Sequence, residues 1–189
     1  MSEQNFKAEK FKSKTFTVPN ILSFFRICLI PLVVWLYCGS RDLFKAGAVL
    51  ILSGITDIAD GFIARRFNMV SDLGKILDPV ADKLTQAAVL ICLITRFPLM
   101  ICPFAMLAAK EIFMIVTGIA ILKKTGNVSS AKWHGKIATF LLYAVMLVHI
   151  FWYQIPYMIS MIFVAVCSLF IAVSFILYGM DNLKKLKQK

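Results

Sequence analysis

Long apolar runs, separated by short polar segments, cover most of the sequence. A helix needs about 20 mostly apolar residues to cross the hydrocarbon core of a bilayer, and six of the runs reach this length. We therefore predict an all-α polytopic membrane protein with six transmembrane helices. The predicted helices cover residues 19–38, 43–66, 74–96, 98–122, 132–152 and 156–178.

The composition favours a membrane protein over an ordinary soluble domain. Of the 189 residues, 60% are hydrophobic, against about 45–50% in a typical soluble domain, and the mean hydropathy is +0.80. We predict one membrane domain over residues 18–180, between a cytoplasmic juxtamembrane segment (1–17) and a basic cytoplasmic tail (181–189). Lysines alternate with phenylalanines in the first segment, which suits contact with anionic lipid headgroups, although a solvated tail fits about as well.

Basic residues determine the predicted orientation of the helices. The formal net charge is +11, and most lysines and arginines fall in the terminal segments and after the second and fourth predicted helices. Because positively charged segments stay on the cytoplasmic side, we predict cytoplasmic termini in a multi-pass protein of the cell (inner) membrane. The basic face suits anionic lipid or phosphorylated substrates, whereas the sequence offers no soluble basic domain for nucleic acid.

Half of the acidic residues, five of ten, lie between positions 56 and 83. Four residues there follow the i, i+3, i+4, i+7 spacing of one helical face: Asp57, Asp60, Gly61 and Ala64. Asp78 and Asp82 are four residues apart, so they share a face of the next predicted helix. Two neighbouring helices are therefore predicted to direct four carboxylates into one site near the cytoplasmic surface.

Four carboxylates in one site require positive charge close by, because ionisable groups at membrane depth are costly without a partner or a function. The nearest cations in the sequence, Arg65, Lys75 and Lys83, are too few and too spread to pair with all four. Divalent metal ions fit better, since Mg²⁺ prefers carboxylates plus substrate phosphates and paired ions suit phosphoryl transfer. Gly61 and Ala64 would leave room for a ligand between the helices, or would serve close helix packing.

The aspartate stretch resembles the signature of a known enzyme family. The pattern Asp57-x2-Asp60-Gly61-x2-Ala64-Arg65-x8-Gly74-x3-Asp78-x3-Asp82 is similar, at all eight fixed positions, to that of the CDP-alcohol phosphotransferases. The resemblance implies a six-helix fold over residues 18–180. It also implies transfer of a phosphatidyl or substituted phosphate group from a CDP-linked donor to an alcohol, with release of CMP, and a homodimer.

The same resemblance implies roles for the matching residues. Two Mg²⁺ ions, with Mn²⁺ as an alternative, would be held by Asp57, Asp60, Asp78 and Asp82. Asp82 would also be the general base that takes the proton from the acceptor hydroxyl. The CDP-binding pocket would be lined by Asp60, Gly61, Ala64, Arg65 and Gly74.

Further resemblances bear on the acceptor alcohol. The first predicted helix begins like those of bacterial phosphatidylglycerophosphate synthases, with the residues Pro19, Asn20, Ser23 and Arg26. Lys110 and Lys136 match cationic positions of these synthases, although Lys110 replaces an arginine and loses bidentate phosphate geometry. Arg26, Lys110 and Lys136 together would bind an acceptor that is itself a phosphate. Arg26 alone could equally reach from its helix to the membrane interface.

We therefore expect phosphatidyl transfer from CDP-diacylglycerol to glycerol 3-phosphate. The alternative is a cardiolipin synthase of the same fold, with phosphatidylglycerol as the acceptor. An intramembrane prenyltransferase would need a longer chain and a second aspartate motif, and a transporter would place its acids near the midplane. Lys110 and Glu111 are adjacent, so they point in different directions on a helix and are not expected to form a simple mutual salt bridge.

Overall fold

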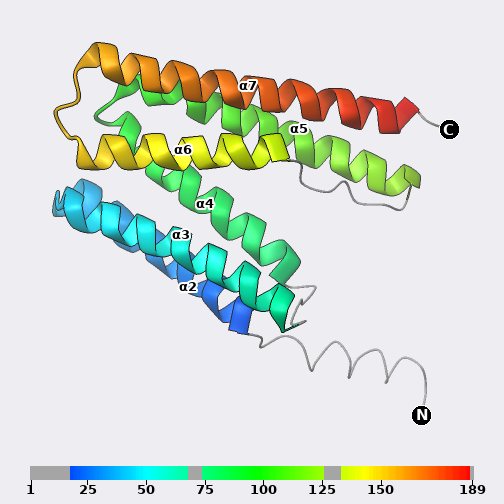
Figure 1. Ribbon diagram of the computed structural model, residues 1–189, viewed down its shortest axis with the longest axis horizontal. Helices are drawn as coiled ribbons and strands as arrows, with labels where there is room; N and C mark the ends of the chain where they lie inside the picture. Colours follow the sequence, from blue (N-terminus) through cyan, green and yellow to red (C-terminus); the bar gives the residue numbers. More distant parts are fainter. Residues whose placement is uncertain (1–17, 68–73, 126–132, 188–189) are drawn as a thin grey trace. The chain divides into compact units, whose positions relative to one another are not determined.

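The computed structural model describes residues 18–67, 74–125 and 133–187, so the predicted juxtamembrane segment lies outside it. All regular structure in these three stretches is helical (Figure 1). With the labels of Figure 1, the long helices are α2 (Val18–Val34), α3 (Leu43–Arg66), α4 (Gly74–Ile94), α5 (Ile101–Thr125), α6 (Trp133–Phe151) and α7 (Tyr157–Lys187). A π-helical turn, η1 (Trp35–Gly39), extends α2, and a 3₁₀ turn, η2 (Pro98–Met100), precedes α5.

In the described residues, five helical segments are long and apolar enough to cross a membrane. They are Asn20–Gly39, Leu43–Ile63, Pro98–Lys124, Trp133–Phe151 and Tyr157–Lys185. The prediction of a polytopic all-α membrane protein is compatible with these five segments. The helix α4 differs, because every stretch of 18 residues in it contains at least three charged side chains. The third predicted span, which corresponds to α4, therefore stays a prediction, and so does the total of six.

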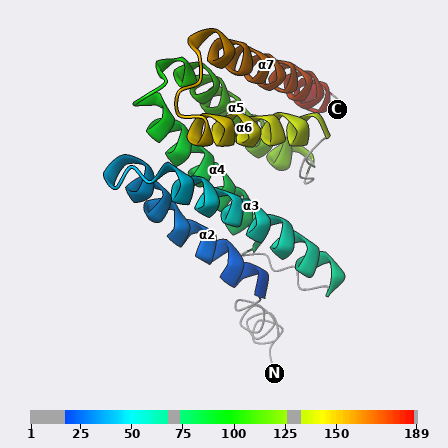
Figure 2. The ribbon, with the colours of Figure 1, turned by 60° about the vertical axis from the view of Figure 1, so that its left-hand side comes forward.

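The chain divides into two compact units, Met1–Cys92 and Leu93–Lys189. In the first unit, α2 and α3 lie side by side (Figures 1 and 2). Asp42 closes the turn between them, because its carboxylate accepts a 3.1 Å hydrogen bond from the backbone N–H of Lys45 and caps the start of α3. The predicted helix boundary at residue 43 coincides with this cap.

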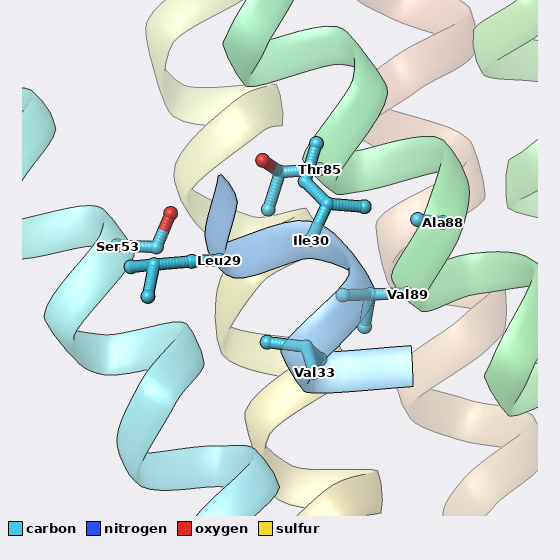
Figure 3. A pocket seen from close by; sticks show the side chains of 7 residues that line it. All are labelled: Leu29, Ile30, Val33, Ser53, Thr85, Ala88 and Val89. Atoms are coloured by element: carbon cyan, nitrogen blue, oxygen red, sulfur yellow. The ribbon is translucent and has the colours of Figure 1, made fainter. Parts of the chain in front are cut away.

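Apolar side chains of α2, α3 and α4 meet in the core of the first unit. Figure 3 shows a small recess there, lined by Leu29, Ile30, Val33, Ser53, Thr85, Ala88 and Val89. The recess leaves no room for a water molecule, so it is a packing gap and not a substrate site. Two fully buried alanines, Ala46 on α3 and Ala81 on α4, fit the close approach of helices that small residues permit in membranes.

In the second unit, α7 packs against both α5 and α6 (Figures 1 and 2). Buried polar groups join these helices. His149 Nε2 lies 2.9 Å from Ser160 Oγ, and Asn182 Nδ2 donates a 2.8 Å hydrogen bond to Thr117 Oγ1. Most of the predicted tail is helical, since α7 continues to Lys187 through leucines and lysines, which favour helix.

Large apolar side chains are exposed on all six long helices, for example Phe44 on α3, Phe140 on α6 and Phe170 on α7. Soluble monomers rarely expose wide apolar patches, and such patches mark contact with a membrane or a protein partner. The apolar exterior and the length of the helices therefore agree with a lipid environment.

Candidate active site

The four predicted aspartates lie on two consecutive helices of the first unit. Asp57 and Asp60 are in the last three turns of α3, and Asp78 and Asp82 are in the first three turns of α4. Residues 67–73 connect these helix ends, so both pairs occupy the connected side of the helices. The carboxylates of Asp57, Asp60 and Asp78 lie close together around one side chain of α2, and Asp82 lies one turn after Asp78 on α4.

The guanidinium of Arg26 on α2 lies among three of these carboxylates. Its Nη1 is hydrogen-bonded to Asp57 Oδ1, and its Nη2 donates a 2.9 Å hydrogen bond to Asp60 Oδ2. The same Nη2 lies 3.8 Å from Asp78 Oδ1. Arg26 is only 2% exposed, so its charge is taken from water and must be balanced by these acids.

Arg26 corrects one step of the sequence reasoning, which sought compensating cations only among the neighbours of the aspartates. Of the expected cations, Lys83 lies 3.7 Å from Asp82, and the side chains of Arg65 and Lys75 are outside the described part of the chain. The packing of α2 on α3 brings a cation from 31 positions away. The signal available in the sequence was an arginine within the apolar run of the first helix.

Ser23 is a second polar contribution of α2 and lies about one helical turn before Arg26. It is completely buried, and its hydroxyl donates to Asp78 Oδ1 and lies 3.5 Å from Asp60 Oδ2. Ser23 and Arg26 thus share the helical face that meets the aspartates. The sequence reasoning noted Ser23 as part of a motif and gave it no role.

The fourth aspartate, Asp82, has a different set of neighbours. Gln86, which is fully buried, donates a 2.8 Å hydrogen bond from Nε2 to Asp82 Oδ2. Lys83 Nζ lies 3.4 Å from Gln86 Oε1 and 3.7 Å from Asp82 Oδ2. The amide of Gln86 therefore fixes the orientation of the Asp82 carboxylate, because α4 places the two residues one turn apart.

One side of the aspartate cluster is buried, and the other side is accessible to ligands. The side chains of Arg26 and Asp60 are 2% and 3% exposed, whereas those of Asp57 and Asp78 are 47% and 37% exposed. Ligands from outside can therefore reach Asp57 and Asp78 without opening the fold.

The donor set of this cluster fits a hard divalent cation. It consists of four carboxylates and the hydroxyl of Ser23, all oxygen donors of the kind that Mg²⁺ prefers. Among the side chains that the structure describes, two cations, Arg26 and Lys83, lie beside four carboxylates, which gives these groups an excess of negative charge. In the described residues, however, three of the four carboxylates lie around the guanidinium of Arg26, and no group of three or more acids, histidines or cysteines is arranged to hold a metal ion.

The residues predicted to bind CDP lie on the same two helix ends. Gly61 directly follows Asp60 on α3, and Gly74 is buried at the first position of α4. Ala64 and Arg65 belong to the last turn of α3, and their side chains are outside the described part of the structure. Their contacts with CDP stay predictions.

The two lysines predicted to bind the acceptor belong to the second unit. Lys136 is exposed in the first turn of α6, and Lys110 is buried on α5. Lys110 Nζ lies 3.0 Å from Glu111 Oε1. The expectation that this adjacent pair forms no salt bridge is therefore wrong, because the long lysine stem reaches around the helix to the neighbouring carboxylate.

Aromatic contacts surround this end of the second unit. The ring of Tyr178 on α7 lies 5.7 Å from Lys110 Nζ and 4.5 Å from the ring of His134 on α6. A Cβ atom at Gly135 would lie 2.6 Å from the Tyr178 hydroxyl, so the Tyr178 side chain packs directly over this glycine and would have to shift if a larger residue replaced it. The sequence reasoning did not identify Tyr178, since its apolar surroundings resemble ordinary core.

Known proteins resemble this chain over most of its length. A sequence model of the family described as CDP-alcohol phosphatidyltransferase matches residues 16–178. A Streptomyces coelicolor protein named "Cardiolipin synthase (CMP-forming)" is 38% identical over 138 residues, which cover 69% of this chain and 64% of that protein. The chain thus spans less than two thirds of this relative.

Other relatives carry a different name, "CDP-diacylglycerol--glycerol-3-phosphate 3-phosphatidyltransferase". The protein of that name from Rickettsia typhi is 37% identical over 130 residues, 66% of this chain and 70% of its own length. The one from Bacillus subtilis is 34% identical over 138 residues, 66% of this chain and 71% of its own length. The second name specifies transfer to glycerol 3-phosphate, whereas the first specifies the product cardiolipin and the release of CMP.

Proposed function

Because the chain belongs to the CDP-alcohol phosphatidyltransferase family, we propose that it transfers a phosphatidyl group from CDP-diacylglycerol to glycerol 3-phosphate. The products would be phosphatidylglycerophosphate and CMP, in phospholipid biosynthesis. The convergence of Asp57, Asp60 and Asp78 on one point carries this proposal. The names of the Rickettsia and Bacillus relatives support the same acceptor.

A cardiolipin synthase of the same fold is the second candidate. The name of the Streptomyces relative favours it, and its acceptor would be phosphatidylglycerol. The two acceptors differ in charge, since glycerol 3-phosphate carries a phosphate monoester and phosphatidylglycerol a singly charged diester. A site with several cations for the acceptor therefore favours glycerol 3-phosphate.

We expect the four aspartates to hold two divalent ions, with Mg²⁺ preferred and Mn²⁺ as the alternative. The ligands would be Asp57, Asp60, Asp78 and Asp82. When bound, such ions neutralise phosphate charge and stabilise both the attacking and the leaving oxygen. The oxygen-only donor set and its excess negative charge support this assignment.

Asp82 is proposed as the general base. Its carboxylate takes the proton from the acceptor hydroxyl while the acceptor oxygen forms a bond to the phosphatidyl phosphorus. The bond from this phosphorus to the oxygen of the CMP phosphate breaks, and CMP leaves with the electron pair. Gln86 supports this role, because its hydrogen bond to Oδ2 holds the carboxylate in one orientation.

The remaining helix ends would bind the substrates. Asp60, Gly61, Ala64, Arg65 and Gly74 are proposed to line the CDP pocket. The glycines and Ala64 leave space beside the helices, and Arg65 would pair with the diphosphate. Lys110 and Lys136 are proposed to contact the phosphate of the acceptor, as is Arg26 when it is not held by the aspartates.

The proposed enzyme is a multi-pass protein of the cell (inner) membrane. In it α4 also crosses the membrane, which brings the number of spans to six. Both termini and the aspartate cluster would face the cytoplasm, from which glycerol 3-phosphate would arrive and into which CMP would be released. The bias of lysine and arginine along the chain supports this orientation. A homodimer is proposed on the precedent of the family alone.

A product assay tests the function. The purified full-length protein is incubated with CDP-diacylglycerol, Mg²⁺ and either glycerol 3-phosphate or phosphatidylglycerol, and the lipid product is identified by mass spectrometry. We expect phosphatidylglycerophosphate and CMP from the first mixture, loss of both with a chelator, and recovery on adding Mg²⁺ back. Product from the second mixture alone would instead identify a cardiolipin synthase, and turnover that persists under chelation would contradict the metal assignment.

A further inference from the structure

We propose that Arg26 is an internal counter-cation of the aspartate cluster, which holds Asp57, Asp60 and Asp78 together without metal and competes with the divalent ion for their oxygens. Arg26 is thus a positioning residue for the metal site. The inference depends on the proposed function only in assuming that the cluster binds a divalent ion.

The contacts of Arg26 place its charge among three of the carboxylates that are proposed to hold the metal. Its two terminal nitrogens reach carboxylates of two different helices, α3 and α4. These are three of the four acids that the family signature contains. One guanidinium thus bridges the two helices that together carry the signature.

Repulsion explains why a cation belongs in this position. Asp60 is almost completely buried, and Asp57 and Asp78 both repel it. Three like charges this close do not stay together without positive charge between them. Arg26 supplies that charge in the protein alone, so the cluster keeps its shape before any ion arrives.

Arg26 and a divalent ion would compete because both use the same carboxylates. Arg26 donates hydrogen bonds to Asp57 Oδ1 and Asp60 Oδ2, and a metal ion would need lone pairs of the same carboxylates. A guanidinium and a divalent ion also repel each other at the separations that both would then have. Binding of the ion therefore requires at least part of the Arg26 head group to withdraw.

Two further features fit such a withdrawal. The Nε atom of Arg26 is buried and makes no hydrogen bond among the described residues, so only the terminal nitrogens hold the head group. Ser23 is neutral and contacts Asp78 and Asp60, so it can keep α2 attached to the cluster after Arg26 moves. A neutral hydroxyl does not repel an incoming cation.

The test measures metal binding without substrates. The full-length protein is purified in detergent, and binding of Mn²⁺ is followed by electron paramagnetic resonance for the wild type, Arg26→Met, Arg26→Lys and Arg66→Met. Methionine keeps much of the apolar stem of arginine and removes the charge. Arg66 is exposed at the end of α3, so Arg66→Met is a control that removes the same charge outside the cluster.

We expect Arg26→Met to lower the Kd of Mn²⁺ by about tenfold, because a competing cation and its charge-assisted hydrogen bonds are removed. Arg26→Lys, which keeps the charge but loses the fork that reaches two carboxylates, should give a Kd between those of the wild type and Arg26→Met. Arg66→Met should leave the Kd within about twofold of the wild type. Without metal, Arg26→Met should unfold at a lower temperature than the wild type, and saturating Mg²⁺ should remove most of this difference.

Two outcomes would overturn the proposal. An unchanged Kd in folded Arg26→Met would mean that Arg26 does not compete with the ion. A higher Kd would mean that Arg26 only arranges the carboxylates for the metal. Should Arg26→Met fail to fold without metal, purification in Mg²⁺ followed by exchange into Mn²⁺ gives the same measurement. Since no substrate is present, failure of the proposed transferase reaction would not alter any of these results.

Discussion

Arg26 on α2 and Asp60 on α3 form a hydrogen-bonded ion pair of 2.9 Å in which both side chains are almost completely buried. The two residues are 34 positions apart. A buried charge that loses its partner is strongly destabilising. The packing of α2 on α3 and the arrangement of the aspartate cluster therefore depend on the same contact.

Substitution of Asp60 by leucine tests this dependence. We expect Asp60→Leu to destabilise the metal-free protein by about 3 kcal/mol, because Arg26 stays buried with less compensation. Thermal unfolding in detergent measures the effect. Asp57→Leu is the matched control, since Asp57 contacts the same guanidinium but is half exposed. This variant should lose less stability than Asp60→Leu. Equal losses in both variants would contradict the importance of burial.

The double variant Arg26→Met/Asp60→Leu measures the interaction energy between the two side chains. Removal of both charges should be less destabilising than the sum of the two single substitutions, because neither charge is left alone. Additive losses would show that the two side chains do not interact energetically.

Substitution of the proposed base should remove turnover and leave the fold intact. We expect Asp82→Asn to lower kcat by at least about 100-fold, since an amide cannot take the proton. Its oxygen can still accept the hydrogen bond from Gln86, so the unfolding temperature should change little. Release of CMP and thermal unfolding measure the two effects, and Asp42→Asn, at the cap of α3, is the control. Retained turnover would remove Asp82 from the role of base.

A side chain at Gly135 should force the Tyr178 ring to shift. Gly135→Ala is expected to destabilise the protein by about 1–3 kcal/mol, because its Cβ would lie 2.6 Å from the Tyr178 hydroxyl and 3.0 Å from the ring. Gly118→Ala is the control, since no atom lies within 4 Å of the added Cβ and alanine favours helix. Unfolding temperatures of both variants, and of Gly135→Ala/Tyr178→Phe, measure the clash. Loss of the hydroxyl should recover part of the stability, and no difference between the two glycine variants would rule the clash out.

Substitution of Lys136 should change the KM for the acceptor more than the KM for the donor. Lys136 is exposed, so Lys136→Met should fold normally and raise the KM for glycerol 3-phosphate by about tenfold through loss of a phosphate contact. The KM for CDP-diacylglycerol should change little. Lys123→Met, which removes an exposed lysine at the end of α5, is the control. Equal changes in both KM values would contradict a specific acceptor contact.

Helix boundaries could be predicted because local chemistry determines them. The range predicted for the second helix, 43–66, agrees with α3, since Asp42 caps its start. The start of α4 at Gly74 also agrees with the prediction. The spacing of Asp57 and Asp60, and of Asp78 and Asp82, then places the acids correctly on their helices.

The partners of these acids could not be predicted in the same way. The contact of Arg26 with Asp57 and Asp60 depends on how α2 is rotated about its axis, and the long apolar run around Arg26 leaves that rotation undefined. The salt bridge between Lys110 and Glu111 was missed for a different reason. The rule that side chains three or four positions apart meet on a helix describes the direction of the Cβ atoms. A lysine side chain is long enough to bend around the helix and reach an adjacent residue.

The order of synthesis gives the buried ion pair a consequence for biogenesis. The ribosome completes α2 before Asp57 and Asp60 exist, so Arg26 reaches the insertion machinery as a lone charge in an apolar segment. An arginine costs about 2.5–3.5 kcal/mol at the centre of an inserting helix and less toward its ends, where Arg26 lies as the seventh residue of the span Asn20–Gly39. Entry of α2 and α3 together, as a helical hairpin, removes this cost, because the arginine then crosses into the bilayer already neutralised.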